Sequence, residues 1–223
     1  MDTNDPSLTI GRFLVEVAGR YGDRCAIRFE DREIRYRDLE RQARQLARAL
    51  VGAGVVKGTR VAVLMANRPE WVVSAFAVGM VGGVLVPVNT FATRFEFDHI
   101  LRHSDSALLL MQPELMKHRY LDDLLAAYPE IAAAEPGRLR VPALPQLRRV
   151  VSLGIDAPRG GVEDWESLLA QGRDVSDELL DELLDEVEPS DDGLIIYTSG
   201  TTANPKGVLH MHRAAVLQGF AAS

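Results

Sequence analysis

Cysteine is almost missing from this chain, which carries a single residue of that type, Cys25, among 223 residues. One thiol cannot form an internal disulfide or a cysteine-based metal cluster, so both are excluded. The scarcity favours a reducing compartment, and residues 1–7 lack the positive and apolar regions of a secretory signal. We therefore expect a cytoplasmic protein, with Cys25 as a core residue of a β-hairpin.

A long uninterrupted apolar run is also missing. The longest apolar stretch, residues 71–88, is interrupted by small or turn-forming residues, namely Ser74, Gly79, Gly82, Gly83 and Pro87. This pattern is typical of a buried helix followed by a buried strand, and it argues against a transmembrane segment. The formal net charge is −7 and no basic stripe is present, so no nucleic-acid partner is expected.

The negative charge is local. Of the 32 acidic residues, ten lie between Asp174 and Asp192 without any lysine or arginine, and the other 22 are slightly outnumbered by 25 basic residues. Apolar residues recur through this segment at helical spacing: Leu179, Leu180, Leu183, Leu184 and Val187. The pattern predicts an amphipathic helix with a solvated acidic face. No metal site is expected, because the acids lie on the polar side and do not converge.

Helical and strand-like patterns alternate along most of the chain. The predicted helices cover residues 8–21 (with Ser7 as the N-cap), 37–53, 69–82, 94–103 and 117–128, and the predicted strands cover residues 25–29, 33–36, 60–65, 84–88, 107–111 and 149–153. This alternation predicts an α/β fold with a mostly parallel sheet flanked by helices. Residues 129–146 are rich in proline, which predicts a long surface loop within one domain.

Three short motifs resemble ligand sites but fit simpler explanations. Residues 52–58 carry spaced glycines, but they follow a helix and lack the spacing of a dinucleotide fingerprint, so a helix end with a turn is favoured. His99 and His103 are four residues apart on one helix without a third ligand, which favours a solvated or packing pair. His210 and His212 would share one face of a strand, and His212 is expected to approach the loop described next.

The most informative segment is residues 197–208, which read Tyr-Thr-Ser-Gly-Thr-Thr-Ala-Asn-Pro-Lys-Gly-Val. They begin where an apolar run ends, residues 194–196, which predicts a buried strand, and residues 207–211 predict another strand. Hydroxyl groups, backbone N–H groups and one ammonium can together surround phosphate oxygens. A Walker A loop needs Gly-Lys-Ser/Thr, whereas Lys206 lies between Pro205 and Gly207, so that loop type is excluded.

Residues 197–208 resemble the signature loop of the adenylate-forming superfamily, which includes acyl-CoA synthetases, peptide-synthetase adenylation domains and luciferases. Residues 35–39, 54–62, 67–71 and 83–90 resemble the N-terminal part of the same family, in the same order. The resemblance covers nearly the whole chain and implies that residues 1–223 are the truncated N-terminal part of the large AMP-binding domain. At one position, Ala203 stands where the family most often has glycine, while the hydroxyls and Lys206 remain.

The resemblance implies a two-step reaction that uses ATP, Mg²⁺ and coenzyme A, as in fatty acid metabolism. A carboxylate attacks the α-phosphate of ATP to give an acyl-adenylate and pyrophosphate, and a thiol then takes the acyl group. Lys206 would be the catalytic residue, because its ammonium can neutralise charge on the departing phosphates. The residues that bind the ATP phosphates would be Thr198, Ser199, Gly200, Thr201, Thr202, Lys206 and Gly207.

The family places its aromatic-histidine, adenine-binding and ribose-binding segments and its catalytic C-terminal lysine after this loop, and the sequence ends at Ser223. We therefore expect a fragment of a carboxylate–CoA ligase that is inactive alone and that accepts a small carboxylic acid as part of the whole enzyme. Apolar surface exposed by truncation would favour self-association. Two alternatives remain open: an adenylation domain or acyl-AMP ligase that delivers to a carrier protein, and a stand-alone, non-catalytic phosphate-binding module.

Overall fold

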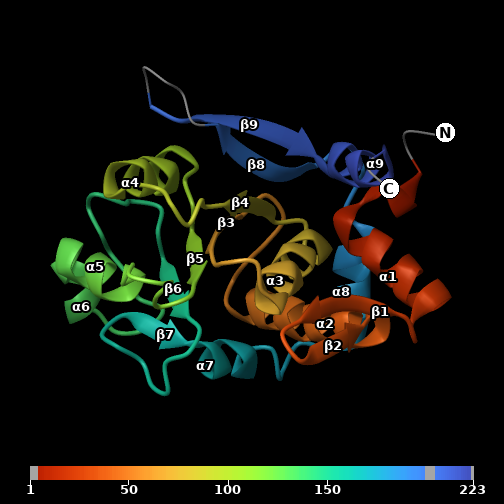
Figure 1. Ribbon diagram of the computed structural model, residues 1–223, viewed down its shortest axis with the longest axis horizontal. Helices are drawn as coiled ribbons and strands as arrows, with labels where there is room; N and C mark the ends of the chain where they lie inside the picture. The colour runs from red at the N-terminus through yellow and green to blue at the C-terminus, as the bar shows by residue number, and fades with distance from the viewer. Residues whose placement is uncertain (1–4, 199–203, 222–223) are drawn as a thin grey trace.

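The computed structural model describes residues 5–198 and 204–221 of the chain (Figure 1). Its centre is a seven-stranded sheet with the strand order β7-β6-β5-β3-β4-β8-β9. Neighbouring strands are parallel, except for β8 and β9 at one edge. The predicted α/β fold with a mostly parallel sheet is therefore confirmed. The strands are β3 (Arg60–Leu64), β4 (Val84–Pro87), β5 (Leu108–Met111), β6 (Arg149–Ser152), β7 (Val162–Asp164), β8 (Asp192–Thr198) and β9 (Lys206–Met211).

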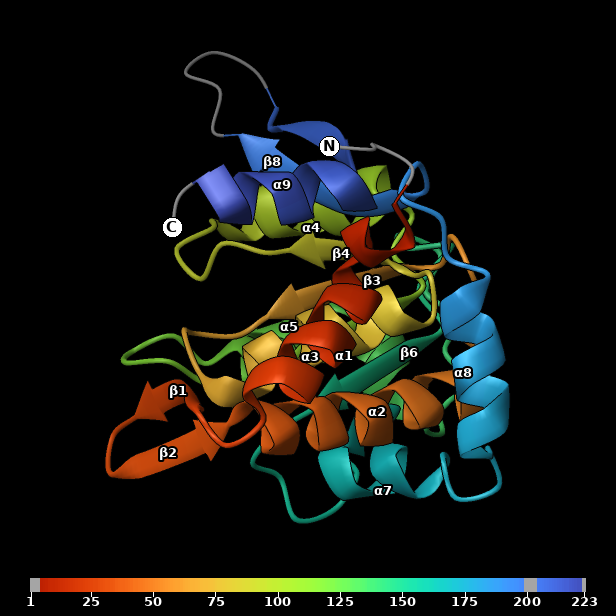
Figure 2. The same cartoon turned by 90° about the vertical axis from the view of Figure 1, so that its right-hand side faces the viewer.

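The central strands are apolar because helices cover both faces of the sheet. In β3, Val61 and Val63 face one core while Ala62 and Leu64 face the other, as expected for side chains that alternate along a strand. Figure 2 views the molecule from the side of α1 and α2. The first core is covered by α1 (Ile10–Tyr21), α2 (Tyr36–Gly52), α3 (Pro69–Met80), α7 (Trp165–Ala170) and α8 (Asp177–Asp185). The second is covered by α4 (Arg94–His103), α5 (Tyr120–Ala127) and α6 (Pro129–Ala133).

A two-stranded antiparallel hairpin, formed by β1 (Cys25–Phe29) and β2 (Arg32–Arg35), is separate from the main sheet (Figure 2). The prediction that Cys25 is a core residue is wrong, because the cysteine is exposed. The strand register shifts between Cys25 and Ile27, and both Ala26 and Ile27 pack against the first core. This irregularity leaves Cys25 on the outer face of the hairpin.

Several boundaries differ from the sequence prediction. A 3-10 turn, η1 (Pro6–Leu8), precedes α1, and the N-cap of α1 is Thr9 in place of Ser7: the Thr9 hydroxyl accepts a hydrogen bond from the Arg12 N–H at 3.3 Å. Residues 129–146 are more than a surface loop, since they contain α6 and bury Leu139, Val141 and Leu144 in the second core. Both β7 and α7 were missed, because elements of three and six residues carry too little periodicity.

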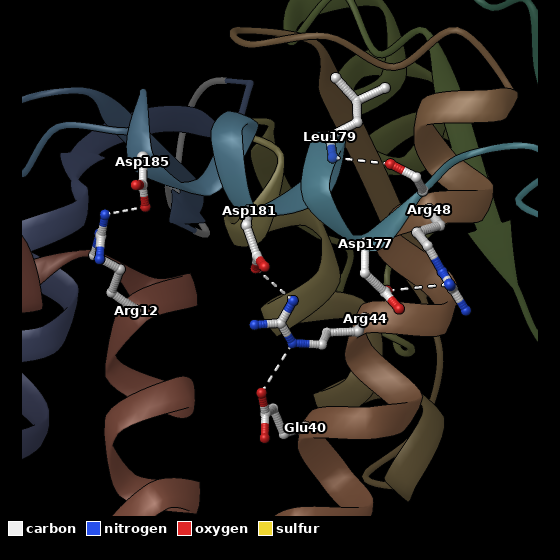
Figure 3. Close-up of polar contacts among 9 residues, drawn as sticks. Arg12, Glu40, Arg44, Arg48, Asp177, Leu179, Asp181 and Asp185 are labelled. Carbon is white, nitrogen blue, oxygen red and sulfur yellow. Dashed lines mark hydrogen bonds and ion pairs between the residues drawn. The ribbon is translucent and has the colours of Figure 1, made fainter.

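The predicted acidic helix is α8, and its acidic face is not simply solvated (Figure 3). Successive turns of α8 present carboxylates to arginines of α1 and α2: Asp177 lies 3.1 Å from Arg48, Asp181 lies 2.7 Å from Arg44, and Asp185 contacts Arg12. These aspartates are more than half exposed, so each pair adds little stability by itself. Leu180 and Leu184 supply the buried contact that holds α8 against the first core.

His212 does not approach the phosphate loop, so that prediction is wrong. β9 ends at Met211 and His212 begins α9 (His212–Ala221), at the opposite end of the β8–β9 hairpin from Lys206. The imidazole is fully buried, and its Nδ1 accepts a hydrogen bond from the Ile10 N–H at 3.2 Å. Burial lowers the pKa of His212 from 6.5 to about 4, and the nearby Asp191 carboxylate only partly opposes this shift. His212 is therefore neutral in the folded protein at pH 7.

The buried neutral state of His212 predicts loss of stability in mild acid. Between pH 6.5 and about 4 the unfolded chain binds a proton at His212 that the folded chain does not, so the free energy of unfolding falls as the pH falls. The slope is about 1.4 kcal/mol per pH unit, and the total loss is about 3 kcal/mol. Urea unfolding of the chain at pH 7, 6, 5 and 4 measures this loss.

The variant His212→Asn keeps an acceptor near the Nδ1 position and removes the titrating group, so its stability should change little between pH 6.5 and 5. His210→Asn, at the neighbouring half-buried histidine of β9, is the matched control and should keep the wild-type slope. Equal slopes in wild type and His212→Asn would refute this role of the buried imidazole.

Candidate functional site

The residues predicted to bind phosphate lie at the carboxyl edge of the sheet. β4 and β8 are parallel neighbours, paired at Leu85 and Leu194, so their carboxyl ends lie on the same side. Ligands of open α/β sheets bind in the crevice at this edge. Thr198 ends β8 and Lys206 begins β9, and the two residues are partners in the antiparallel ladder. The hydroxyl-bearing residue and the lysine are therefore neighbours where the chain leaves and re-enters the sheet.

Lys206 is exposed, and no carboxylate in residues 5–198 and 204–221 forms an ion pair with its ammonium. An unpaired ammonium at the end of a strand can bind an anionic group without first breaking a salt bridge. The other residues predicted for this loop lie outside the described residues: Ser199, Gly200, Thr201 and Thr202, together with Ala203. The described part of the site is therefore the two segments that flank the loop, residues 197–198 and 204–207, which we call the shoulders of the loop.

Gly207 allows Tyr197 to lie across the neighbouring strand. The two residues are partners in the β8–β9 ladder, and a Cβ atom on Gly207 would lie 2.9 Å from Ile195 Cγ2 and 3.1 Å from Tyr197 Cζ. Glycine is therefore needed here for close packing. Burial raises the pKa of the Tyr197 phenol, so the hydroxyl keeps its proton near neutral pH.

The histidine pair of α4 packs against both shoulders of the loop. His99 Nε2 lies 2.9 Å from the Pro205 carbonyl oxygen, and His103 Nδ1 lies 2.8 Å from the Tyr197 hydroxyl. The two imidazole rings are 5.2 Å apart. The histidines form the packing pair that the sequence favoured, but no sequence pattern indicated that their partners would be the loop. The described residues contain no group of three or more His, Cys, Asp or Glu that could hold a metal ion.

A hollow of about 260 Å³ lies beneath the shoulders of the loop, between β8, the end of β4 and the start of α4. Thr198, Asn89 and Glu96 supply polar groups to its lining, and Ile100 and Ile196 supply apolar ones. Glu96 also closes a capping box: its Oε2 accepts from the Thr93 N–H at 2.7 Å, and this backbone hydrogen bond lowers the pKa of Glu96. The carboxylate is therefore ionised and fixed at the start of α4.

A second hollow of about 600 Å³ opens on the other side of Asn89, between the 91–97 segment and α5, and its lining is mostly apolar. Both hollows lie beyond the carboxyl ends of β3 and β4. A third hollow, of about 790 Å³ in the 137–148 segment that precedes β6, contains none of the predicted site residues. The carboxyl edge therefore combines the loop shoulders with space for a ligand.

Comparison with known proteins gives one family. A sequence model described as AMP-binding enzyme matches residues 14–223. YngI of Bacillus subtilis (strain 168), a candidate acyl-CoA synthetase, is 34% identical over 206 residues, which are 92% of this chain and 37% of YngI. The mitochondrial medium-chain acyl-CoA ligase ACSF2 of Mus musculus is 30% identical over 223 residues, which cover 96% of this chain and 35% of the mouse protein.

Solved structures show the same fold. The anthranilate CoA ligase AuaEII, in complex with anthranoyl-AMP, superimposes with a TM-score of 0.72 at 24% identity and covers 92% of this chain and 35% of the AuaEII chain. The NpsA N-terminal subdomain of Klebsiella oxytoca, in complex with 3-hydroxybenzoyl-AMSN, gives a TM-score of 0.61 at 24% identity and covers 97% and 43% of the two chains. In the part of the chain that the structure describes, no helix has the length and apolar character needed to cross a bilayer.

The close contact at Gly207 predicts a local loss of stability in Gly207→Ala. The added methyl group must displace the Tyr197 ring and with it the hydrogen bond to His103, at a cost of about 1–3 kcal/mol. Urea unfolding measures the loss. Gly219→Ala in α9 is the matched control, because a Cβ there meets no atom within 4 Å and should be neutral or stabilising. Equal stability of the two variants would contradict the packing argument.

Proposed function

Because this chain belongs to the AMP-binding enzyme family, we propose that it forms the N-terminal portion of the large domain of an ATP-dependent carboxylate–CoA ligase. YngI and mouse ACSF2 support this function, since one is a candidate acyl-CoA synthetase and the other a medium-chain acyl-CoA ligase. The chain spans 37% and 35% of their lengths. We accordingly propose that the complete reaction needs protein parts beyond this chain and that the chain alone is inactive.

The proposed reaction transfers an acyl group in two balanced steps. A carboxylate oxygen attacks the α-phosphorus of ATP, the bond to the β-phosphate oxygen breaks, and pyrophosphate leaves with the bonding electrons. The sulfur of coenzyme A then attacks the acyl carbon, AMP leaves, and the thiol proton passes to solvent. Mg²⁺ would be held chiefly by the ATP phosphates, because Mg²⁺ in sites of this kind uses substrate phosphates together with one or two carboxylates. We propose a fatty acid as the carboxylic acid, in line with the relatives.

The observation that carries the proposal is the exposed ammonium of Lys206, which lies beside Thr198 at the carboxyl edge and has no ion-pair partner among residues 5–198 and 204–221. Negative charge builds on the pyrophosphate group as it leaves, and a fixed positive charge there lowers the barrier. Thr198, Ser199, Thr201 and Thr202 would add hydroxyl donors, while Gly200 would let the backbone approach the phosphate oxygens. The loop would therefore bind the phosphate groups more tightly in the transition state, when pyrophosphate is leaving, than it binds the same groups of ATP in the ground state.

A ligase that uses coenzyme A is favoured over the two alternatives. Delivery to a carrier protein is suggested by a solved structure of an artificial adenylation–PCP fusion, NpsA-ThdA of Klebsiella oxytoca, whose identity of 23% shows the fold alone. A stand-alone phosphate-binding module would not need the family match that extends over residues 14–223. We also keep a reducing, cytoplasmic location as part of the proposal, because the single cysteine is free.

The proposed role of Lys206 predicts a defect in the first step. In the full-length protein that carries this chain, Lys206→Ala should lower the rate of ATP–pyrophosphate exchange by about 10²–10³-fold, because one oxyanion-stabilising group is lost. The KM for the acid should change much less. Lys206→Arg keeps the charge and serves as the control. An equal effect of Lys206→Ala on rate and on acid binding would assign the lysine to general binding and end this proposal.

The apolar run of β8 is only partly covered, contrary to the buried strand that the sequence predicted. Leu194 and Ile195 are half-buried and Ile196 is 42% exposed, while Val208, Leu209 and Met211 of the edge strand β9 are 44%, 53% and 42% exposed. An apolar edge strand is a template for pairing with another chain. We propose that the isolated chain self-associates through this edge.

Self-association should depend on concentration and on the apolar edge. Sedimentation velocity should show the wild-type chain moving from monomer to larger species as its concentration rises, and Leu209→Lys should shift the distribution to monomer. Leu179→Lys on α8, where the leucine is 41% exposed, is the control and should behave like wild type. Monomeric wild-type protein at all concentrations would exclude this association.

A further inference from the structure

We propose that His99 and His103 are positioning residues, which hold Tyr197 and Pro205 and thereby fix the neighbouring Thr198 and Lys206 for the binding of pyrophosphate. The inference rests on the proposed function in one respect, that the loop binds phosphate. Its structural part, the clamp formed by α4 on Tyr197 and Pro205, rests on the described contacts alone.

The end of the β8–β9 hairpin has little registered backbone pairing with the rest of the sheet. Within the described residues, Leu85 and Leu194 form the single registered pair between β4 and β8. Beyond Leu194, the ladder partners of β8 belong to β9, which is an edge strand itself. The hollow of about 260 Å³ lies between this end of β8 and β4. Backbone pairing with the sheet therefore does not fix the position of Thr198 and Lys206.

Helix α4 supplies the missing connection, and it runs alongside the hairpin (Figure 1). His99 and His103 are one turn apart, so both point from the same face of the helix toward the hairpin. His99 Nε2 lies 2.9 Å from the Pro205 carbonyl oxygen, which can only accept, so this nitrogen carries the proton and donates. This bond holds the shoulder of the loop that leads into β9.

His103 holds the other shoulder. Its Nδ1 lies 2.8 Å from the Tyr197 hydroxyl, and its ring stands edge-on to the tyrosine ring with centroids 5.7 Å apart. The Tyr197 ring in turn rests on Gly207 of β9. The two histidines therefore contact both strands of the hairpin, immediately before Thr198 and immediately before Lys206.

The helix that carries the clamp is itself firmly held. The capping box of Thr93 and Glu96 fixes its first turn, and the Arg94–Asp98 pair at 2.8 Å spans the next. Ile100 and Leu101 are buried in the second core. A rigid helix bound to this hairpin reduces the conformational freedom that a ligand would otherwise have to remove, and such preorganisation raises affinity.

The test separates the clamp from phosphate binding. In this chain, the double variant His99→Phe/His103→Phe keeps two aromatic rings and removes the hydrogen bonds to Pro205 and Tyr197. Amide exchange at Thr198 and Lys206, followed by NMR, should become about tenfold faster or more, while amide exchange in the central strands β3 and β5 changes little. Binding of inorganic pyrophosphate with Mg²⁺, followed by titration calorimetry, should weaken about tenfold.

Conservative variants test the hydrogen bonds themselves. His99→Gln places an amide N–H near the Nε2 position and His103→Asn places an amide near the Nδ1 position, so both should recover most of the wild-type exchange rate and affinity. His118→Phe is the matched control, because His118 stacks on Tyr120 away from the hairpin. It should leave both measurements unchanged.

Three results would overturn the clamp, the positioning role or the phosphate-binding function of the loop. Unchanged amide exchange in the double variant removes the clamp. Faster exchange with unchanged pyrophosphate affinity removes the positioning role. If the double variant exchanges faster but the wild-type chain itself binds no pyrophosphate, the clamp stands and the proposed function of the loop is wrong.

Discussion

Burial of the central parallel strands on both faces is the constraint on which the rest of the structure depends. β3, β4 and β5 consist almost entirely of apolar residues, and helices that pack on each face keep these strands parallel and in register. All their carboxyl ends therefore meet at one edge. The segments after β3 and β4, the start of α4 and the shoulders of the loop after β8 are brought together there, although they lie far apart in the sequence.

The β8–β9 hairpin carries the candidate site at the border of this sheet and is fixed at its two ends by different chemistry. At one end, Nδ1 of the buried His212 imidazole accepts a hydrogen bond from the Ile10 backbone N–H. The backbone N–H of His212 donates to the backbone carbonyl of Asp191, and the Asp191 carboxylate lies 2.7 Å from the Lys57 ammonium. At the other end, His99 and His103 contact Pro205 and Tyr197. Between these ends the hairpin exposes apolar side chains and presents Lys206 without an ion-pair partner in the described residues.

The sequence predicted the features that depend on local pattern and missed those that depend on distant partners. The apolar strands and the helix Arg94–His103 followed from periodicity, and the family followed from the loop motif with its ordered upstream segments. The exposure of Cys25 depends on a register shift, and the burial of His212 depends on a turn into α9 that its neighbours do not signal. The contacts of His99 and His103 join residues that are 106 and 94 positions apart, which no spacing rule can detect.

We propose that this chain provides the pyrophosphate-binding part of an acid-activating site and little of the nucleoside-binding part. Competition binding to the chain in the presence of Mg²⁺ tests it most directly, with a fluorescent ATP analogue displaced by pyrophosphate, ATP or adenosine. Pyrophosphate and ATP should displace the analogue at similar concentrations, and adenosine should not displace it. Displacement by adenosine as effective as that by ATP, or failure of pyrophosphate to displace the analogue, would contradict it.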